Sequence, residues 1–172
     1  LPYYLGTNEY TPATIHPCGF VHLEEFRLED GLPIWTFRGG GWELEKRVWM
    51  AYGHNTTYVS YALTRAPRPV TLTLRPLVNH RDFHRETKGR VDWDFLPVEQ
   101  DGRGCCILRA FEGAHPYLLC TLPLMEQVPT GVWYWNFLHR REQERGLDCN
   151  EDLYAPCVLR GRLRPGETQV LI

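Results

Sequence analysis

The chain has 172 residues, of which 43% are hydrophobic and 23% charged, and these proportions are typical of a folded domain and exclude a disordered chain. Nineteen Lys and Arg against twenty-one Asp and Glu leave a net charge of -2, so there is no overall positive field to attract nucleic acid or anionic lipid. No apolar run approaches the roughly 20 residues of a membrane-spanning helix. We therefore expect one domain with no nucleic-acid partner and no membrane partner.

The first residues, LPYYLGTNEY, contain neither the basic nor the apolar region of a signal peptide. Because position 1 is not Met, we expect an internal fragment of a longer cytoplasmic protein. The sequon Asn55-Thr56-Thr57 points the other way, but it would matter only in a secreted protein.

The cysteines do not occur in CxxC pairs and so lack the short ligand spacing of a zinc site. A chain of this size does not need a disulfide framework as its main source of stability. We therefore expect reduced thiols, several of them buried. The six residues are Cys18, Cys105, Cys106, Cys120, Cys149 and Cys157.

Short β-type segments, broken by Gly, Pro and Asn turns, run from Ile34 to the end of the chain, and this pattern predicts an all-β antiparallel sandwich. Apolar and polar residues alternate from Trp42 to Tyr52, and the turn at residues 53–55 leads into a second alternating segment at residues 57–63. These two segments predict a hairpin. A third strand, from Val70 up to Pro76, follows a Pro-Arg-Pro corner, and the economical arrangement places it beside the other two in a meander.

The rest of the chain predicts more strands and one short helix. The helix is expected from Leu138 to Arg145, a polar stretch without β-branched residues, with Gly146 as its stop. Gly39-Gly40-Gly41 is expected to be a hairpin turn, because it lacks the features of a phosphate-binding loop. The further strands are expected at residues 91–98, 105–111, 117–122, 133–137, 158–163 and 168–172.

The aromatic run at residues 133–137 alternates with period two, so Trp133, Trp135 and Phe137 should share one face of a strand. Tyr134 and Asn136 should share the other face. About half of these rings are expected in the core, and the others suit a docking surface or a platform for sugar rings.

Five acidic residues near four arginines resemble the carboxylate pairs of glycosidases, but such clusters are more often solvated salt-bridge networks, which is the reading we prefer. The acidic residues are Glu142, Glu144, Asp148, Glu151 and Asp152. No nucleophile elbow and no dinucleotide fingerprint occurs, and we expect no cofactor.

The polar run Asn79-His80-Arg81-Asp82-Phe83-His84 follows directly on a predicted strand. Loops that leave a sheet often carry functional residues, because the sheet holds them while the loop exposes them. We expect an inter-domain or substrate-groove contact here. Local loop structure is the main alternative, and a metal pair of His80 and His84 would require a helix that the preceding strand argues against.

Three blocks of the sequence resemble the N-terminal region of prokaryotic-type glycogen-debranching enzymes, the amylo-alpha-1,6-glucosidase type. The first is HPCGFVHLEEFRLEDGLPIWTFRGGGWELEKRVWMAYGHNTTYVSYAL, the second is LRPLVNHRDFH, and the third is WYWNFLHRREQERGLDCNEDLYAPCVLRGRLRPGE. They follow one another over almost the whole chain, with a weak match between residues 91 and 127. Cys157 departs from the pattern, because the family more often has Gly after the Pro.

The resemblance implies a super-sandwich of the galactose-mutarotase type that packs on a C-terminal catalytic (α/α)6 domain of the same polypeptide. It implies hydrolysis of the α-1,6 branch linkages of glycogen or limit dextrin by that domain, whose acid and base carboxylates are not in this sequence. This chain would then be non-catalytic and wall part of the α-glucan groove. A free-standing carbohydrate-binding sandwich is the alternative. The expected groove or inter-domain residues are Arg81, Asp82, His84, Trp135, Asn136, Arg145, Asp148 and Asp152.

Overall fold

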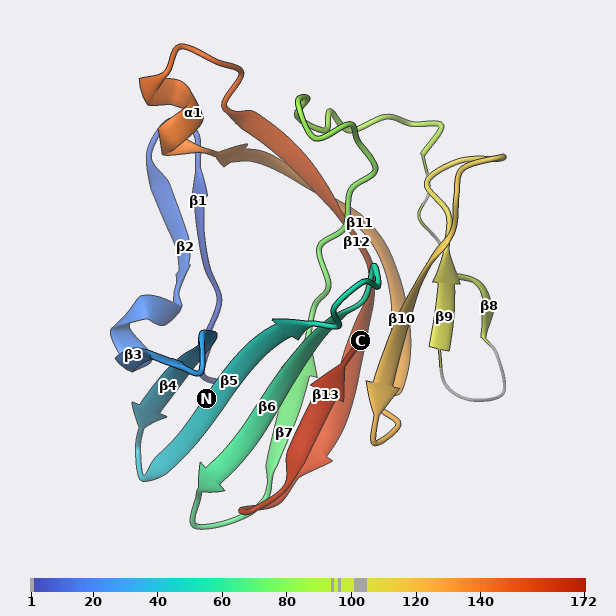
Figure 1. The fold of residues 1–172 in the computed structure, drawn as a ribbon. Coiled ribbons are helices and arrows are strands. Elements are labelled where there is room, and N and C mark those ends of the chain that lie inside the picture. The colour runs from blue at the N-terminus through green and yellow to red at the C-terminus, as the bar shows by residue number, and fades with distance from the viewer. Residues whose placement is uncertain (1, 94, 96, 101–104) are drawn as a thin grey trace.

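A computed structural model describes residues 2–93, 95, 97–100 and 105–172 (Figure 1). Strands dominate this part of the chain, so the expected all-β class with at most one or two short helices is confirmed. The elements are β1 (Thr7–Tyr10), β2 (Thr14–Cys18), η1 (a 3-10 turn, Gly19–His22), β3 (Leu23–Glu29), β4 (Leu32–Gly39), β5 (Trp42–Met50), β6 (Thr57–Arg65), β7 (Val70–Leu74), β8 (Pro97–Gln100), β9 (Cys105–Leu108), β10 (Tyr117–Leu122), β11 (Glu126–Leu138), α1 (Arg140–Glu144), β12 (Asn150–Leu163) and β13 (Thr168–Leu171).

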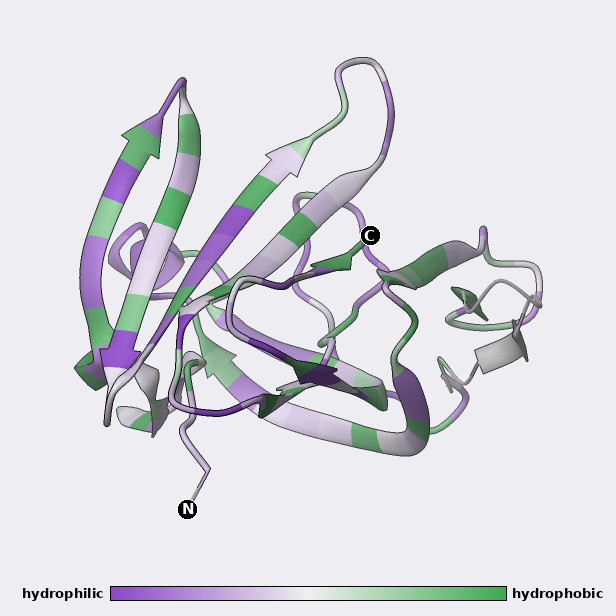
Figure 2. Ribbon diagram, turned by 90° about the horizontal axis from the view of Figure 1, so that it is seen from below, coloured by the Kyte–Doolittle hydropathy of each residue, from purple (hydrophilic) through white to green (hydrophobic). Residues whose placement is uncertain are grey.

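Within the described residues the strands form two antiparallel sheets. One has the order β2-β1-β11-β12-β7 and the other the order β3-β4-β5-β6-β13-β10-β9-β8. Polar and apolar residues alternate along many strands in Figure 2, which is the pattern of strands with one face toward a core. Among the described residues, no helix has the length and apolar character needed to cross a membrane.

The hairpin expected at residues 42–63 is confirmed, because β5 pairs with β6 over nearly its whole length. The turn expected at Gly39-Gly40-Gly41 joins β4 to β5, and Gly40 and Gly41 both have positive φ angles, of 41° and 86°. The predicted meander is wrong. β7 leaves the β5–β6 sheet and pairs with β12 in the opposite sheet, so the Pro-Arg-Pro corner carries the chain from one layer to the other.

The main core lies between the two sheets. Leu44 and Leu63 come from the larger sheet, and Leu74 and Leu159 come from the smaller one. A second buried cluster, which includes Phe95, Leu108 and Tyr154, fills the space beside β9 and β12. Burying apolar surface in these two clusters is the main force that holds the layers together.

The strand expected at residues 91–98 is wrong for residues 91–93 and for residue 95, which are not in a strand. Residues 94 and 96 lie outside the described residues, and β8 begins at Pro97. The predicted series of strands began only at Ile34, but three strands, β1, β2 and β3, precede it. These early strands have no fully buried residue, so the alternation that marks a buried face is weak in them.

The expectation that all cysteines are reduced is wrong for two of them. Cys105 on β9 lies directly opposite Cys120 on β10, and a disulfide joins the two. Cys18, Cys106, Cys149 and Cys157 are free. The pairing follows from the register of two strands, which spacing along the sequence does not reveal.

Strand β11 is longer than the expected segment 133–137 and contains two irregularities. Between Tyr134, opposite Leu153, and Phe137, opposite Glu151, the strand has one more residue than its partner. Such a bulge shifts the alternation by one. Because opposite residues share a face, Phe137 lies on the face of Tyr134, so its predicted place beside Trp133 is wrong.

Candidate functional site

The candidate site lies where β11 and β12 extend beyond the sandwich and α1 connects them (Figure 1). The short helix forms as expected. It begins after His139, and Gly146 follows it with a left-handed φ of 73° that ends the helix. A hollow of 780 Å³ opens between this helix and the loop at residues 81–86. It is lined by Glu9, Arg81, Phe83, His84, Glu86, Leu138, His139, Arg140, Arg141, Glu142, Arg145, Leu147 and Asp148.

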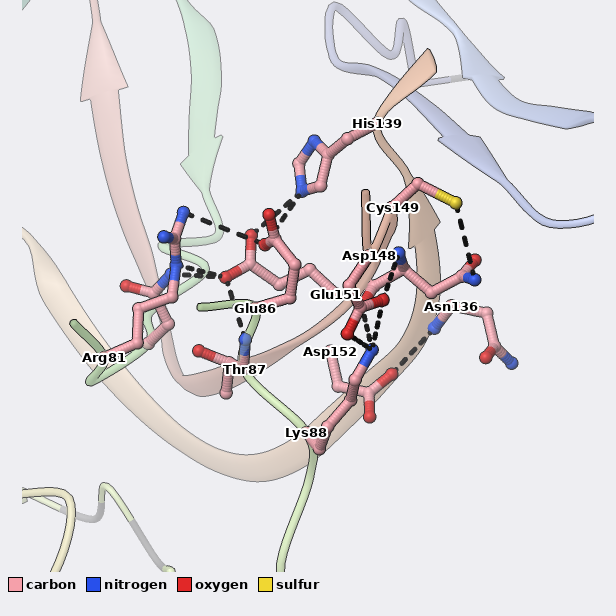
Figure 3. A network of polar contacts seen from close by, with 12 residues as sticks. Arg81, Glu86, Thr87, Lys88, Asn136, His139, Asp148, Cys149, Glu151 and Asp152 are labelled. Atoms are coloured by element: carbon pink, nitrogen blue, oxygen red, sulfur yellow. Dashed lines mark hydrogen bonds and ion pairs between the residues drawn. The ribbon is translucent and has the colours of Figure 1, made fainter. Parts of the chain in front are cut away.

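Glu151, at the start of β12, is the buried acid beneath this hollow, and its side chain is only 4% exposed. Its Oε1 atom accepts hydrogen bonds from Asn79 Nδ2 at 2.8 Å and from the Thr87 amide at 3.3 Å. The same atom lies 2.7 Å from Arg81 Nε. Its Oε2 atom faces the other way and lies 3.0 Å from His139 Nε2 (Figure 3).

These contacts decide the charge of Glu151. Burial alone raises the pKa of a carboxyl group, because it disfavours the charged form. Here the hydrogen bonds from Asn79, His139 and the Thr87 amide, together with the positive charge of Arg81, outweigh burial and hold the pKa of Glu151 below its ordinary value. Glu151 is therefore ionised at neutral pH.

Glu86 lies beside Glu151, but it is held differently. Its Oε2 atom is buried and has no hydrogen-bond partner among the described residues. It lies 3.6 Å from His139 Nε2 and 3.8 Å from an Arg81 nitrogen. Burial, followed by the nearby negative charge of Glu151, raises the pKa of Glu86. Two neighbouring carboxyl groups thus have pKa values shifted in opposite directions.

Four of the expected site residues line the hollow: Arg81, His84, Arg145 and Asp148. Asp148 pairs with Lys88 at 3.0 Å, and this hydrogen-bonded contact lowers the pKa of Asp148. Lys88 also donates to the Asn150 carbonyl. The Lys88 side chain therefore fastens the loop at residues 81–89 to the turn that follows α1.

The other four expected residues lie outside the lining of the hollow. Asp82 accepts a hydrogen bond from the His84 amide at 2.9 Å, which is a local turn within the loop. Asp152 is buried and accepts hydrogen bonds from the Asn136 amide at 2.8 Å and from the Gly89 amide at 2.9 Å. Asp152 and Asn136 therefore join β11, β12 and the loop to one another.

Trp135 is 52% exposed and stacks on Trp133, with ring centroids 5.7 Å apart. The backbone of Gly89 runs directly against its ring, because a Cβ atom at that position would lie 2.3 Å from Trp135 Cζ3. The expected division of these rings is found in this pair. Trp133 also packs against the buried Phe95, while Trp135 keeps part of its ring toward solvent.

The interpretation of the acidic cluster as a salt-bridge network is confirmed for its two acidic residues in α1. Glu142 pairs with Arg145 at 3.3 Å, and Glu144 pairs with Arg141 at 2.7 Å. The polar run at residues 79–84 does not form a single surface. His84 lines the hollow, whereas His80 packs against the rings of Trp93 and Phe111.

The sequence reasoning missed Glu86 and His139 and did not place Glu151 in the site. The signal was weak. Glu86 comes two residues after the polar run, and His139 is the second residue of the segment predicted as a helix, so neither stood out as a site residue. Glu86, His139 and Glu151 come together because the loop crosses the β11–β12 pair. A backbone hydrogen bond from the Asp152 amide to the Thr87 carbonyl holds the loop there.

Comparison with known proteins gives one finding. The family model described as "Glycogen debranching enzyme N terminal" matches residues 2–170. No curated protein and no solved structure matches the chain. Because the family match covers nearly the whole length, the resemblance noted in the three sequence blocks is confirmed, and the chain belongs to the glycogen debranching enzyme N-terminal family.

Proposed function

We propose that this chain is the non-catalytic N-terminal domain of an enzyme that hydrolyses α-1,6 branch points in glycogen or limit dextrin in the cytoplasm. In this proposal a C-terminal (α/α)6 domain of the same polypeptide supplies the catalytic acid and base. The hollow and its rim contact that domain and form one wall of the α-glucan groove. The family match over residues 2–170 is the observation that carries the proposal.

The arrangement of the carboxylates supports a non-catalytic role. A glycosidase needs two carboxyl groups on either side of a sugar, with room for the glycosidic bond between them. Glu86 and Glu151 instead lie side by side, and both contact the same His139 nitrogen and the same Arg81 guanidinium. The two carboxylates are therefore held by the same pair of basic side chains rather than set apart across a cleft.

The rim of the hollow supports a role as a contact surface. Arg145 is 66% exposed, and within the described part of the chain its guanidinium pairs with Glu142 of the preceding helix, so it is accessible to a partner. Arginine suits such contacts, because its planar group binds carboxylates and sugar hydroxyls in a fixed geometry. The half-exposed Trp135 ring offers a flat apolar face near the same end of the sandwich.

A comparison of this chain with the full-length polypeptide tests the proposal. Both are incubated with phosphorylase limit dextrin, and released glucose is measured. We expect release by the full-length polypeptide and none by the chain alone. Hydrolysis by the chain alone would overturn the non-catalytic assignment.

The groove contact has a matched pair of variants. Arg145 and Arg164 are equally exposed, at 66% and 67%, and each pairs with a Glu three residues away. In the full-length polypeptide we expect Arg145→Ala to raise KM for limit dextrin severalfold, whereas Arg164→Ala, at the turn before β13, leaves it unchanged. If both substitutions changed KM equally, the hollow would not be part of the α-glucan groove.

The alternative is a carbohydrate-binding module that works without a catalytic domain, with Trp135 as its platform. Titration of the chain with glycogen, followed by Trp fluorescence, separates the two. Saturable binding by the chain alone that Trp135→Ala abolishes would favour the binding module over a supporting domain.

A further inference from the structure

Three side chains from separate parts of the chain bring their ligand atoms together at the floor of the hollow. Glu86 comes from the loop that follows β7, His139 comes from the end of β11, and Glu151 comes from the start of β12. One imidazole nitrogen and two carboxylate oxygens all lie within 4.8 Å of one another. Figure 3 shows the three side chains converging.

The spacing of these atoms suits a small divalent cation. Nitrogen and oxygen ligands at about 2.0–2.2 Å from a tetrahedral Zn²⁺ ion are separated from each other by about 3.4 Å. His139 Nε2 lies 3.0 Å from Glu151 Oε2 and 3.6 Å from Glu86 Oε2, and these values lie on either side of that separation.

In metal sites of proteins, a carboxylate that binds the metal usually accepts hydrogen bonds that fix its orientation. Glu151 is oriented in the same way by the donors around it. Its three partners Arg81, Asn79 and the Thr87 amide all bind Oε1. Oε2 is left facing His139 and Glu86. Arg81 binds Oε1 through Nε, and another of its nitrogens lies 3.8 Å from Glu86 Oε2, so the guanidinium borders the shared space.

Glu86 supplies an independent observation. Its side chain is only 13% exposed, and its buried Oε2 has no hydrogen-bond partner among the described residues. A buried oxygen without a hydrogen bond is costly in a folded protein, and the contacts of Oε2 with His139 and Arg81, at 3.6 and 3.8 Å, are longer than hydrogen bonds. This oxygen points toward His139 Nε2, so a cation bound between them would satisfy it.

From this geometry we propose that Glu86, His139 and Glu151 form a binding site for a first-row transition-metal cation, Zn²⁺ by preference. One imidazole and two carboxylates are ligands that Zn²⁺ accepts, and three protein ligands leave a fourth position open toward the hollow. The cation ties the loop at residues 81–89 to β11 and β12. The site does not depend on the debranching function, because its ligands all belong to this chain.

Metal binding by the purified chain tests the site directly. After dialysis against a chelator, the chain is titrated with Zn²⁺ by calorimetry, and thermal unfolding is followed with and without Zn²⁺. We expect one equivalent of Zn²⁺ to bind and to raise Tm, since a ligand that binds only the folded state stabilises it. Absence of binding would overturn the proposal and leave His139 itself as the bridge between the two carboxylates.

Variants identify the ligands. Glu86→Gln keeps the size of the side chain and removes one ligand charge, so we expect it to weaken Zn²⁺ binding at least about 10-fold while the folded circular dichroism spectrum is retained. His139→Gln should do the same. Glu144→Gln, which changes an exposed acid on the neighbouring helix, is the matched control and should bind Zn²⁺ as the unmodified chain does.

Cobalt distinguishes this site from a site at a free cysteine. Co²⁺ bound by nitrogen and oxygen ligands shows visible d–d bands without the intense charge-transfer absorption of a thiolate ligand. A thiolate band, or binding that persists in Glu86→Gln and His139→Gln but is lost in Cys149→Ser, would overturn the assignment.

Discussion

Three donors from one loop meet at a single oxygen of the Glu151 carboxylate. Arg81, Asn79 and the Thr87 amide all bind its Oε1, and they belong to the loop that crosses the start of β12. Glu151→Gln keeps the shape but removes the charge opposite Arg81. We expect a loss of about 2 kcal/mol in the free energy of unfolding, because removing one partner of a buried pair leaves the other uncompensated.

The same substitution has a defined pH dependence. The pKa of Glu151 is lower in the folded chain than its ordinary value of 4.5, which applies to the unfolded chain. Its stabilising contribution is therefore complete above about pH 4.5 and is lost as the pH falls through the folded pKa. Urea unfolding at a series of pH values should show the gap between the two proteins shrinking in acid. Glu144→Gln should cost less than about 0.5 kcal/mol at every pH.

At the scale of elements, the Cys105–Cys120 disulfide joins β9 to β10, which also pair along their backbones. The bridge closes a loop with a sequence separation of 15 residues, for which loop closure predicts about 3 kcal/mol of stabilisation. The double variant Cys105→Ser/Cys120→Ser should lose about that much free energy of unfolding under oxidising conditions. Under reducing conditions it should match the unmodified chain. Cys18→Ser, at an exposed free thiol, is the control.

The number of reactive thiols is the measurement that could contradict the disulfide. With the disulfide formed, four cysteines of the denatured oxidised chain should react with a thiol reagent. Six reactive thiols in protein isolated without reductant would contradict the disulfide and restore the reduced state expected of a cytoplasmic protein.

The elements that the sequence predicted well are those defined by neighbouring residues. The β5–β6 hairpin follows from alternation on either side of a short turn, and α1 follows from a run of helix formers that ends at Gly146. The break in alternation at residues 135–136 was not visible, because a bulge depends on how β11 fits β12. Asn136 has a φ of 63° there, which only the paired strand explains.

At the scale of the whole molecule, the two layers are held by leucines from opposite sheets. Leu63 on β6 is almost completely buried in the main cluster, whereas Leu28 on β3 is largely exposed. Leu63→Ala should lower the free energy of unfolding by about 3 kcal/mol, through lost burial and the cavity that remains. Leu28→Ala should change it by less than about 0.5 kcal/mol. Chemical denaturation of both variants checks this, and equal losses would contradict the assigned core.

The sequence by itself determined the all-β class, the family, the central hairpin, the short polar helix and the polar loop after β7. Each of these depends on alternation, turn chemistry or motifs within a few residues of one another. The tertiary structure alone decided that β7 joins β12 across the sandwich, that Cys105 faces Cys120, and that Glu86, His139 and Glu151 meet. Strand alternation specifies which face of a strand is buried but not which strand lies beside it, so contacts between distant segments appear only when the two sheets have packed.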